Sequence, residues 1–207
     1  MILYHADREN LLSEGITLTL ENNYHLAQKD LHVIYDLYPD GLSRHGVHYF
    51  DDCIRDIRSY WLPNGNNRIE IILPDDFSAA KRDLDNSFCE YNFELVRRAL
   101  FPKVPSRMQC LFAVASIEEF VQWQDCNFPP DCHVYEISVS DSTQRFDSKW
   151  LRGGYVLNQG SIGGSYLGFS PVLNLNSAVK YWSGMQTDSP RWEYLVSFPV
   201  TVGKRVR

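Results

Sequence analysis

Glu193 is the residue whose type and setting point most directly to chemistry in this sequence. It stands between two aromatic residues in the stretch 191–200, RWEYLVSFPV, whose alternating apolar residues predict a late β-strand. A carboxylate in this position is either a solvated strand residue or a fixed anion that stabilises positive charge in a transition state. Taken alone, the exposed strand residue is the simpler interpretation.

Two upstream segments contain further side chains that suit an anionic ligand. In LYHADR, His5 ends a short β-leaning segment, and Arg8 could hold a phosphate or cover the surface. In PSRMQCLF, Ser106 and Arg107 precede an apolar stretch that contains Phe112. The planar guanidinium of Arg107 matches a diphosphate or a carboxylate, and an ion pair at a strand edge explains it equally well.

Cysteine and glycine patterns give weaker signals. The five cysteines have irregular spacing, which predicts free thiols in a reducing compartment; in an exported protein, Cys126 and Cys132 could close a small loop. Cys110 with His133 as base lacks any local signature, and a buried free cysteine is usually inert. The glycine-rich segment 152–168 lacks the Lys-Ser/Thr ending of a phosphate-binding loop.

The composition is that of one globular domain. The chain has 207 residues, of which 44% are hydrophobic and 14% aromatic, with a net charge of −6. Binding to nucleic acid is disfavoured, because it requires clustered Lys and Arg. No segment reaches the roughly 20 apolar residues of a membrane span, and the charged N-terminus does not read as a signal peptide.

The elements that must position these residues form an irregular mixture. Helical signals fall at 7–15, 50–61, 86–100, 117–123 and 176–183, and strand signals at 2–5, 16–20, 69–73, 107–115, 133–140 and after 191. Residues 141–172 are turn-rich and predict a loop or lid. Because no βαβ pattern repeats, the order predicts an α+β fold in a single domain, 1–207.

Three segments, read in order, resemble a known family. They are LYHADRENLLSEG (3–15), PSRMQCLFAVASIEEFVQW (105–123) and AVKYWSG followed by RWEYLVSFPV (178–184 and 191–200). Together they resemble a bacterial family of ADP-ribosyltransferase-like domains, which includes type III effectors that ADP-ribosylate host ubiquitin on threonine. EYLV is also similar to the glutamate strand of the His-Tyr-Glu transferases. The resemblance implies a split mixed β-sheet core with flanking helices.

The resemblance also implies roles for individual residues, with NAD as co-substrate. His5 would contact a ribose hydroxyl, Arg107 and Arg8 would bind phosphates, and Glu193 would be catalytic at the nicotinamide ribose. Ser106, Phe112 and the segment 140–143 (SDST) compete for the middle motif that seats the cofactor. No metal ligand set is expected.

The sequence departs from related enzymes near its catalytic candidate. Arginine-directed transferases carry Glu or Gln two residues before the catalytic glutamate, where this chain has Arg191. After the first-strand histidine, where relatives often have Gly or Thr, it has Ala6 and Asp7. Arginine is therefore disfavoured as acceptor, while threonine, serine, a nucleic-acid base or water stay open, and the net charge disfavours a nucleic acid.

The function expected from this resemblance is mono-ADP-ribosyl transfer from NAD to a protein hydroxyl, with host ubiquitin as the candidate target and no membrane partner. The protein would be cytoplasmic or secreted into a host cytosol as an effector. One alternative is a non-catalytic module of the same fold that binds a peptide or nucleotide, with Asp147, Trp150 and the following loop as its recognition surface. Another is hydrolysis of NAD at the same site.

Overall fold

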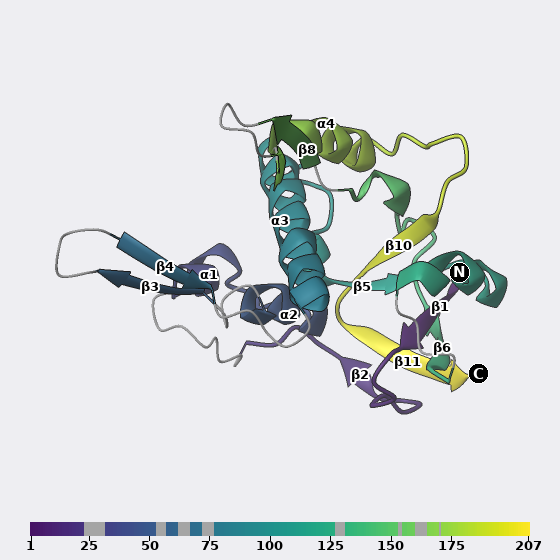
Figure 1. The fold of residues 1–207 in the computed structure, drawn as a ribbon. Helices are drawn as coiled ribbons and strands as arrows, with labels where there is room; N and C mark the ends of the chain where they lie inside the picture. The colour runs from purple at the N-terminus through teal and green to yellow at the C-terminus, as the bar shows by residue number, and fades with distance from the viewer. Residues whose placement is uncertain are drawn as a thin grey trace.

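The protein has the α+β fold that its sequence predicts, and its sheets are antiparallel (Figure 1). The computed structural model describes residues 1–22, 32–52, 57–61, 67–71, 77–126, 131–152, 155–159, 165–169 and 171–207. Within these ranges, no helix is both long enough and apolar enough to cross a membrane.

The first sheet joins the two ends of the chain. Its order is β1 (Ile2–Asp7), β6 (His133–Ser138), β11 (Val200–Arg205) and β2 (Thr17–Leu18). β6 pairs with β1 on one side and with β11 on the other, and all three pairings of this sheet are antiparallel. The strands predicted at 2–5, 16–20 and 133–140 are therefore confirmed, although β2 is shorter than expected.

The second sheet carries Glu193. Its order is β5 (Cys110–Ala113), β10 (Trp192–Ser197) and β7 (Arg145–Asp147). A two-residue bridge between Tyr4 and Val114, with both N···O distances 2.9 Å, joins it to the first sheet. Every strand pairing among the described residues is antiparallel, so the expected mixed sheet is wrong for this part of the chain.

Two helices cover one face of the second sheet, as Figure 1 shows: α3 (Phe77–Leu100) and α4 (Pro171–Trp182). Their apolar side chains and those of β5, β7 and β10 form one core cluster, which includes Cys89, Phe93, Val96, Cys110, Phe146, Ala178, Tyr181, Trp182 and Leu195. Since α3 and α4 supply much of this cluster, they fix the position of the side chains on that face.

The opposite face of the second sheet packs on the first sheet. Leu3 of β1 and Ile137 of β6 share a core cluster with Tyr194 and Val196 of β10. β10 is therefore covered on both faces, and residues 193–196 are all buried. The late strand is confirmed, but the simpler interpretation of Glu193 as a solvated residue is wrong, because only 3% of it is exposed.

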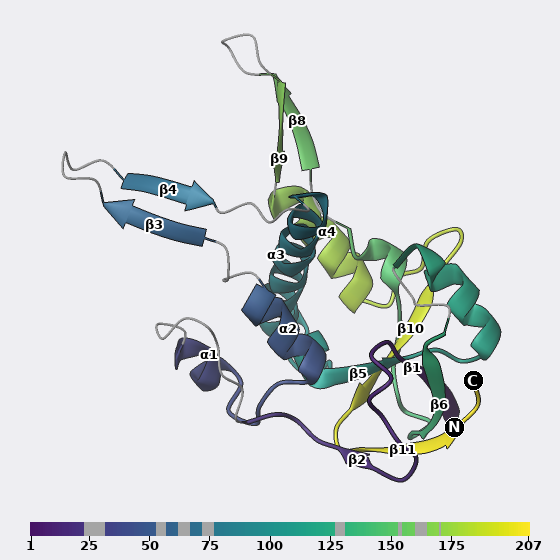
Figure 2. The ribbon, with the colours of Figure 1, turned by 60° about the horizontal axis from the view of Figure 1, so that its bottom comes forward.

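The remaining elements lie around α3. The helices α1 (His32–Leu37) and α2 (Arg44–Asp52) precede it, and α2 packs against α3. Two antiparallel hairpins, β3 (Ile57–Trp61) with β4 (Asn67–Ile71) and β8 (Tyr155–Gln159) with β9 (Ser165–Phe169), extend away from the body of the molecule (Figure 2).

Several expected elements differ from the structure. Residues 8–15 form turns instead of a helix, because the Asp7 carboxylate accepts the N–H groups of Glu9 and Leu12 and holds the chain in a loop. The helix expected at 50–61 is replaced by the end of α2 and by β3, whose pairing with β4 overrides the helical spacing. Residues 141–172, expected to be a loop or lid, contain β7, β8 and β9.

The central segment also differs in detail. Instead of one strand over 107–115, there is a 3₁₀ turn, η2 (Arg107–Gln109), followed by β5. The helix predicted after Ser116 is a 3₁₀ helix, η3 (Ile117–Cys126). Gly184 ends α4 with a φ of +75°, as predicted, although α4 begins earlier than Asn176. Cys132 is a free, buried thiol, so the loop-closing disulfide is not formed.

Candidate functional site

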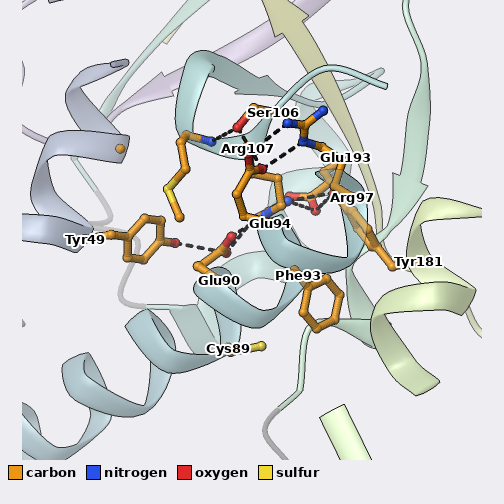
Figure 3. Close-up of polar contacts among 12 residues, drawn as sticks. Tyr49, Cys89, Glu90, Phe93, Glu94, Arg97, Ser106, Arg107, Tyr181 and Glu193 are labelled. Atoms are coloured by element: carbon orange, nitrogen blue, oxygen red, sulfur yellow. Dashed lines mark hydrogen bonds and ion pairs between the residues drawn. The ribbon is translucent and has the colours of Figure 1, made fainter. Parts of the chain in front are cut away.

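Five side chains from five different elements form one hydrogen-bonded cluster around a buried guanidinium (Figure 3). We call this group the Arg107 cluster: Arg107 of η2, Glu90 of α3, Glu193 of β10, Tyr49 of α2 and Tyr181 of α4. The aromatic and apolar packing of α3 and α4 on the second sheet brings Glu90, Tyr181 and Glu193 together. Ser106 caps η2 by accepting the N–H of Met108 at 3.1 Å, which fixes the turn that carries Arg107.

Arg107 binds both carboxylates of the cluster. Its Nε and Nη2 donate to Glu90 at 2.7 and 2.9 Å, in the bidentate geometry typical of arginine–carboxylate pairs. Its Nη1 donates to Glu193 Oε1 at 2.5 Å and to the Tyr181 hydroxyl at 2.7 Å. Burial alone would lower the pKa of Arg107, but Glu193 and Glu90 raise it well above its usual value, so the guanidinium stays charged.

Glu193 is held through a single oxygen. The Tyr181 hydroxyl donates to Oε1 at 2.8 Å, and Arg107 donates to the same atom. Both hydrogen bonds that the described residues make to this carboxylate therefore end on Oε1 and leave Oε2 for another partner. Burial raises the pKa of Glu193, and Arg107 opposes that shift only in part. Glu193 is thus an immobile carboxylate with an increased affinity for protons.

The two tyrosines of the cluster are neutral donors. The Tyr49 hydroxyl donates to Glu90 at 3.1 Å, and burial together with Glu90 raises the pKa of Tyr49 well above 10. Burial also raises the pKa of Tyr181 well above 10, against the charge of Arg107. Each phenol therefore stays protonated and donates a hydrogen bond to a carboxylate.

Phe112 connects the cluster to the first strand. The guanidinium carbon of Arg107 lies 4.5 Å from the Phe112 ring centroid, in a cation–π arrangement. The ring of His45 in α2 contacts Phe112 edge-on, with 4.8 Å between centroids. The backbone carbonyl of Phe112 accepts a hydrogen bond from His5 Nδ1 at 2.7 Å. His5, His45 and Arg107 therefore surround one residue of β5.

The two histidines near Phe112 favour their neutral forms. Burial lowers the pKa of His5, although its hydrogen bond to Phe112 opposes the shift. Burial also lowers the pKa of His45 well below 6.5, and the charges of Arg107 and Arg8 lower it further. Arg8 is exposed, and its positive charge acts on both imidazoles.

Ser106 belongs to a neighbouring network. Its hydroxyl donates to Glu94 Oε2 at 2.9 Å. Glu94 is also bound by Arg97 and Arg98 of the same helix, with an N···O distance of 2.8 Å in each ion pair. We call Glu94, Arg97, Arg98 and Ser106 the Glu94 network; it ties the segment before η2 to α3. Ser106 thus supports the turn that carries Arg107 and does not contact Glu193.

The structure brings most of the predicted site residues together. His5, Arg107, Phe112 and Glu193, from segments far apart in the sequence, converge on one region, and Arg8 lies close enough to influence its histidines. Segment 140–143 lies elsewhere, in an exposed turn between β6 and β7 where the hydroxyls of Ser140 and Ser142 hydrogen-bond each other.

The sequence does not predict three contributors to this region: Glu90, Tyr49 and His45. Glu90 and Glu94 are four residues apart and flank the apolar Phe93, so two carboxylates on a buried helix face were a readable signal. Tyr181 was expected in the core and lies there, with no exposed surface, but its hydroxyl also serves the cluster. Tyr49 and His45 gave no comparable signal, because they fall outside the helix expected from residue 50.

Two other candidates from the sequence are buried side chains. Burial raises the pKa of Cys110 to about 12, which keeps the thiol protonated near neutral pH and makes it a poor nucleophile. Asp147 has no exposed surface, and 8% of Trp150 is exposed, so these two side chains do not themselves form a recognition surface. The described residues contain no group of three or more His, Cys, Asp or Glu side chains that could hold a metal ion.

Fold and site together define an α+β protein built of two joined antiparallel sheets, with a buried arginine between two glutamates. A family model described as "Protein of unknown function (DUF2441)" matches residues 3–207. The chain therefore belongs to the DUF2441 family. No curated protein matches it in sequence.

Proposed function

We propose that this protein is an NAD-dependent mono-ADP-ribosyltransferase that modifies a threonine or serine hydroxyl of a protein, with host ubiquitin as the candidate acceptor. The observation that carries the proposal is the fixation of Glu193: Arg107 and Tyr181 bind its Oε1 at 2.5 and 2.8 Å. Such a carboxylate is preorganised, so it need not reorient as charge develops.

In the proposed reaction, Glu193 Oε2 accepts a hydrogen bond from a hydroxyl of the nicotinamide ribose. The bond between ribose carbon and nicotinamide nitrogen breaks, and its electron pair leaves with nicotinamide. The positive charge that develops on the ribose is stabilised by the carboxylate more than the ground state is. The acceptor oxygen then bonds to the ribose carbon, and its proton passes to Glu193, whose raised pKa favours this role.

The structure changes the role that we assign to Arg107. Four of its five N–H groups already donate to Glu90, Glu193 or Tyr181, and only 5% of Arg107 is exposed, so the guanidinium is committed to the cluster. Arg107 is therefore a positioning residue for Glu193. Arg8 is then the residue that we propose to bind the phosphates of NAD, while His5 keeps its proposed contact with a ribose.

The sheet arrangement also supports the proposal. The strand with His5 and the strand with Glu193 belong to different sheets, which meet at the bridge between Tyr4 and Val114. A ligand that contacts both residues would lie across this junction. Two separate sheets joined by this bridge are compatible with a split sheet core, which the resemblance implies.

A matched pair of variants tests the proposal. Glu193→Gln keeps the side-chain shape and removes its charge, whereas Glu94→Gln makes the same change in the Glu94 network. The two glutamates are equally buried, with 3% and 4% exposed. With biotin-labelled NAD, wild type and Glu94→Gln should label a protein in a eukaryotic lysate or purified ubiquitin, and Glu193→Gln should not.

The other outcomes separate the alternatives. Release of nicotinamide without protein labelling would make water the acceptor. If folded wild-type protein neither releases nicotinamide nor labels a protein, the proposal that it is an enzyme is refuted. The low exposure of Glu193 favours one second candidate, a non-catalytic binding module in which the Arg107 cluster is structural. NAD binding without turnover would identify that module.

A further inference from the structure

A second site candidate lies outside the Arg107 cluster. It is a cavity of about 590 Å³, within the range of small-molecule sites. It lies where η3, the 3₁₀ turn η4 (Ser148–Trp150) and the segment before β10 meet. We call it the Lys149 pocket; it is lined by Gln122, Ser148, Lys149, Leu151, Ser189, Pro190 and Arg191.

A buried aspartate organises this pocket. Asp147 Oδ1 accepts the backbone N–H of Lys149 at 3.0 Å and that of Arg191 at 2.9 Å. Its Oδ2 accepts the N–H and the hydroxyl of Thr187, both at 2.7 Å. Burial alone would raise the pKa of Asp147, but the donors of Thr187, Arg191 and Lys149 lower it. The ionised carboxylate therefore holds the backbones of two cationic residues side by side.

The cationic side chains are tethered to hydroxyls. Lys149 Nζ donates to Ser189 Oγ at 2.9 Å, and Arg191 Nε donates to Ser148 Oγ at 2.9 Å. The described lining of the pocket contains no carboxylate. Two positive charges and two hydroxyls thus converge on one cavity, in an arrangement suited to an anion with several acceptor oxygens.

A neighbouring tryptophan gives an independent observation. The Arg191 guanidinium carbon lies 4.4 Å from the ring centroid of Trp123, which fixes the plane of the guanidinium. Arg191 lines the cavity, so this stacking holds its guanidinium beside the cavity.

We propose that the Lys149 pocket binds a phosphate monoester of a small organic molecule. Its phosphoryl group lies between Lys149 and Arg191, where a dianion is better matched than a carboxylate. The cavity is larger than a phosphate ion, and Leu151 and Pro190 offer apolar contacts for the organic part. Binding at this pocket requires only the folded protein and does not depend on the proposed reaction with NAD.

Calorimetric titration with phenyl phosphate tests the proposal. Inorganic phosphate, which lacks the organic part, and benzoate, which carries a carboxylate, are the comparison ligands. Wild type should bind phenyl phosphate more tightly than either. Lys149→Met should weaken binding by roughly ten- to a hundredfold, as expected for loss of one charge-assisted contact. Lys103→Met, which removes an exposed lysine elsewhere, should bind as wild type does.

Each other result overturns a stated part of the proposal. No binding of phenyl phosphate at millimolar concentration, or equal binding by Lys149→Met, would exclude the site. Equal affinity for benzoate would exclude phosphoryl recognition, and equal affinity for inorganic phosphate would exclude a role for the organic part. Glu193→Gln should bind phenyl phosphate normally, so the result is independent of the proposed transferase activity.

Discussion

Arg107 compensates two buried negative charges at once. Glu90 and Glu193 are 5% and 3% exposed, and each forms an ion pair with its guanidinium. An ion in a protein interior loses several kcal/mol of hydration, which the partner charge must offset. Removal of Arg107 would leave two carboxylates close together without a cation, whereas removal of the Glu193 charge leaves the bidentate pair with Glu90 intact.

Arg107→Met should therefore destabilise the protein by about 3–5 kcal/mol, since breaking a buried ion pair leaves an uncompensated charge. Glu193→Gln should cost less, because Arg107 keeps Glu90. Urea unfolding measures both. Arg98→Met is the control, because its side chain is 33% exposed and it pairs with Glu94, which also binds Arg97. A loss below about 1 kcal/mol for Arg107→Met would contradict this account of the cluster.

Tyr181→Phe should separate positioning from folding. The ring remains stacked on Phe146, with 4.9 Å between centroids, while Glu193 loses one donor. We expect the kcat for nicotinamide release to fall about tenfold with little change in KM, as for loss of one modest hydrogen bond. Tyr135→Phe removes a hydroxyl that donates to the carbonyl of Leu12, far from Glu193 in sequence, and should leave kcat unchanged. Equal kcat values for the two variants would count against a positioning role.

His45 should make stability depend on pH. Its pKa in the folded protein is well below 6.5, chiefly through burial and then through Arg107, Arg8, His48 and His5. Below about pH 6.5 the unfolded chain binds more protons than the folded protein. The free energy of unfolding therefore decreases as the pH is lowered, by up to about 1.4 kcal/mol per pH unit.

His45→Phe keeps an aromatic ring and should reduce that slope between pH 7 and 5, measured by urea unfolding at each pH. The lowered pKa of His5 acts with the same sign. The raised pKa of Glu193 has the opposite effect on stability. Above pH 4.5 its carboxylate ionises more readily in the unfolded chain than in the buried site, so the free energy of unfolding decreases as the pH rises. Both remain in the variant, so the difference between the two slopes reports His45. Identical slopes would show that His45 titrates normally.

At the scale of elements, the contact of α2 with η2 positions Tyr49 and His45 beside Arg107. Gly46 permits it, since a Cβ at this position would lie 2.3 Å from the carbonyl oxygen of Met108. Ala in place of Gly inside a helix normally stabilises by about 1 kcal/mol. Here Gly46→Ala should instead destabilise by about 1–3 kcal/mol, as overpacking against backbone does. Thermal unfolding gives the sign directly, and a raised Tm would show that the two elements can move apart.

The sequence predicts some of these elements well, for a local reason. β1, β6 and β10 have apolar patterns that specify a strand without further information. The burial of Glu193 is not local, because it depends on α3 and α4 on one face and the first sheet on the other. For the same reason, the sequence of β10 alone predicts an exposed glutamate. Glu193 becomes a candidate catalytic residue only when His5 and Arg107 upstream are considered with it.

Other elements could not be predicted because pairing decided them. The apolar residues of 50–61 have helical spacing, yet β3 forms there against β4. The turn-rich residues 141–172 contain β7, which pairs with β10 beside Glu193, and the hairpin β8–β9. A single sequence carries no direct sign of such partners, so local propensity gave the wrong state.

At the scale of the whole molecule, the two sheets and the helical layer place the Arg107 cluster between α3, α4 and the second sheet, next to the first strand. One family model spans residues 3–207, so it covers the strands from both ends of the chain that form this arrangement. The net charge of −6 opposes a nucleic-acid acceptor and leaves a protein hydroxyl as the proposed target.

The most direct test of the central claim is the rate of nicotinamide release from NAD by wild type, Glu193→Gln and Glu94→Gln, each shown to be folded by its thermal transition. We expect turnover by wild type and by Glu94→Gln, and a rate lower by on the order of 10²–10³ for Glu193→Gln, as for loss of one preorganised electrostatic group. A folded Glu193→Gln protein that releases nicotinamide at the wild-type rate would contradict it.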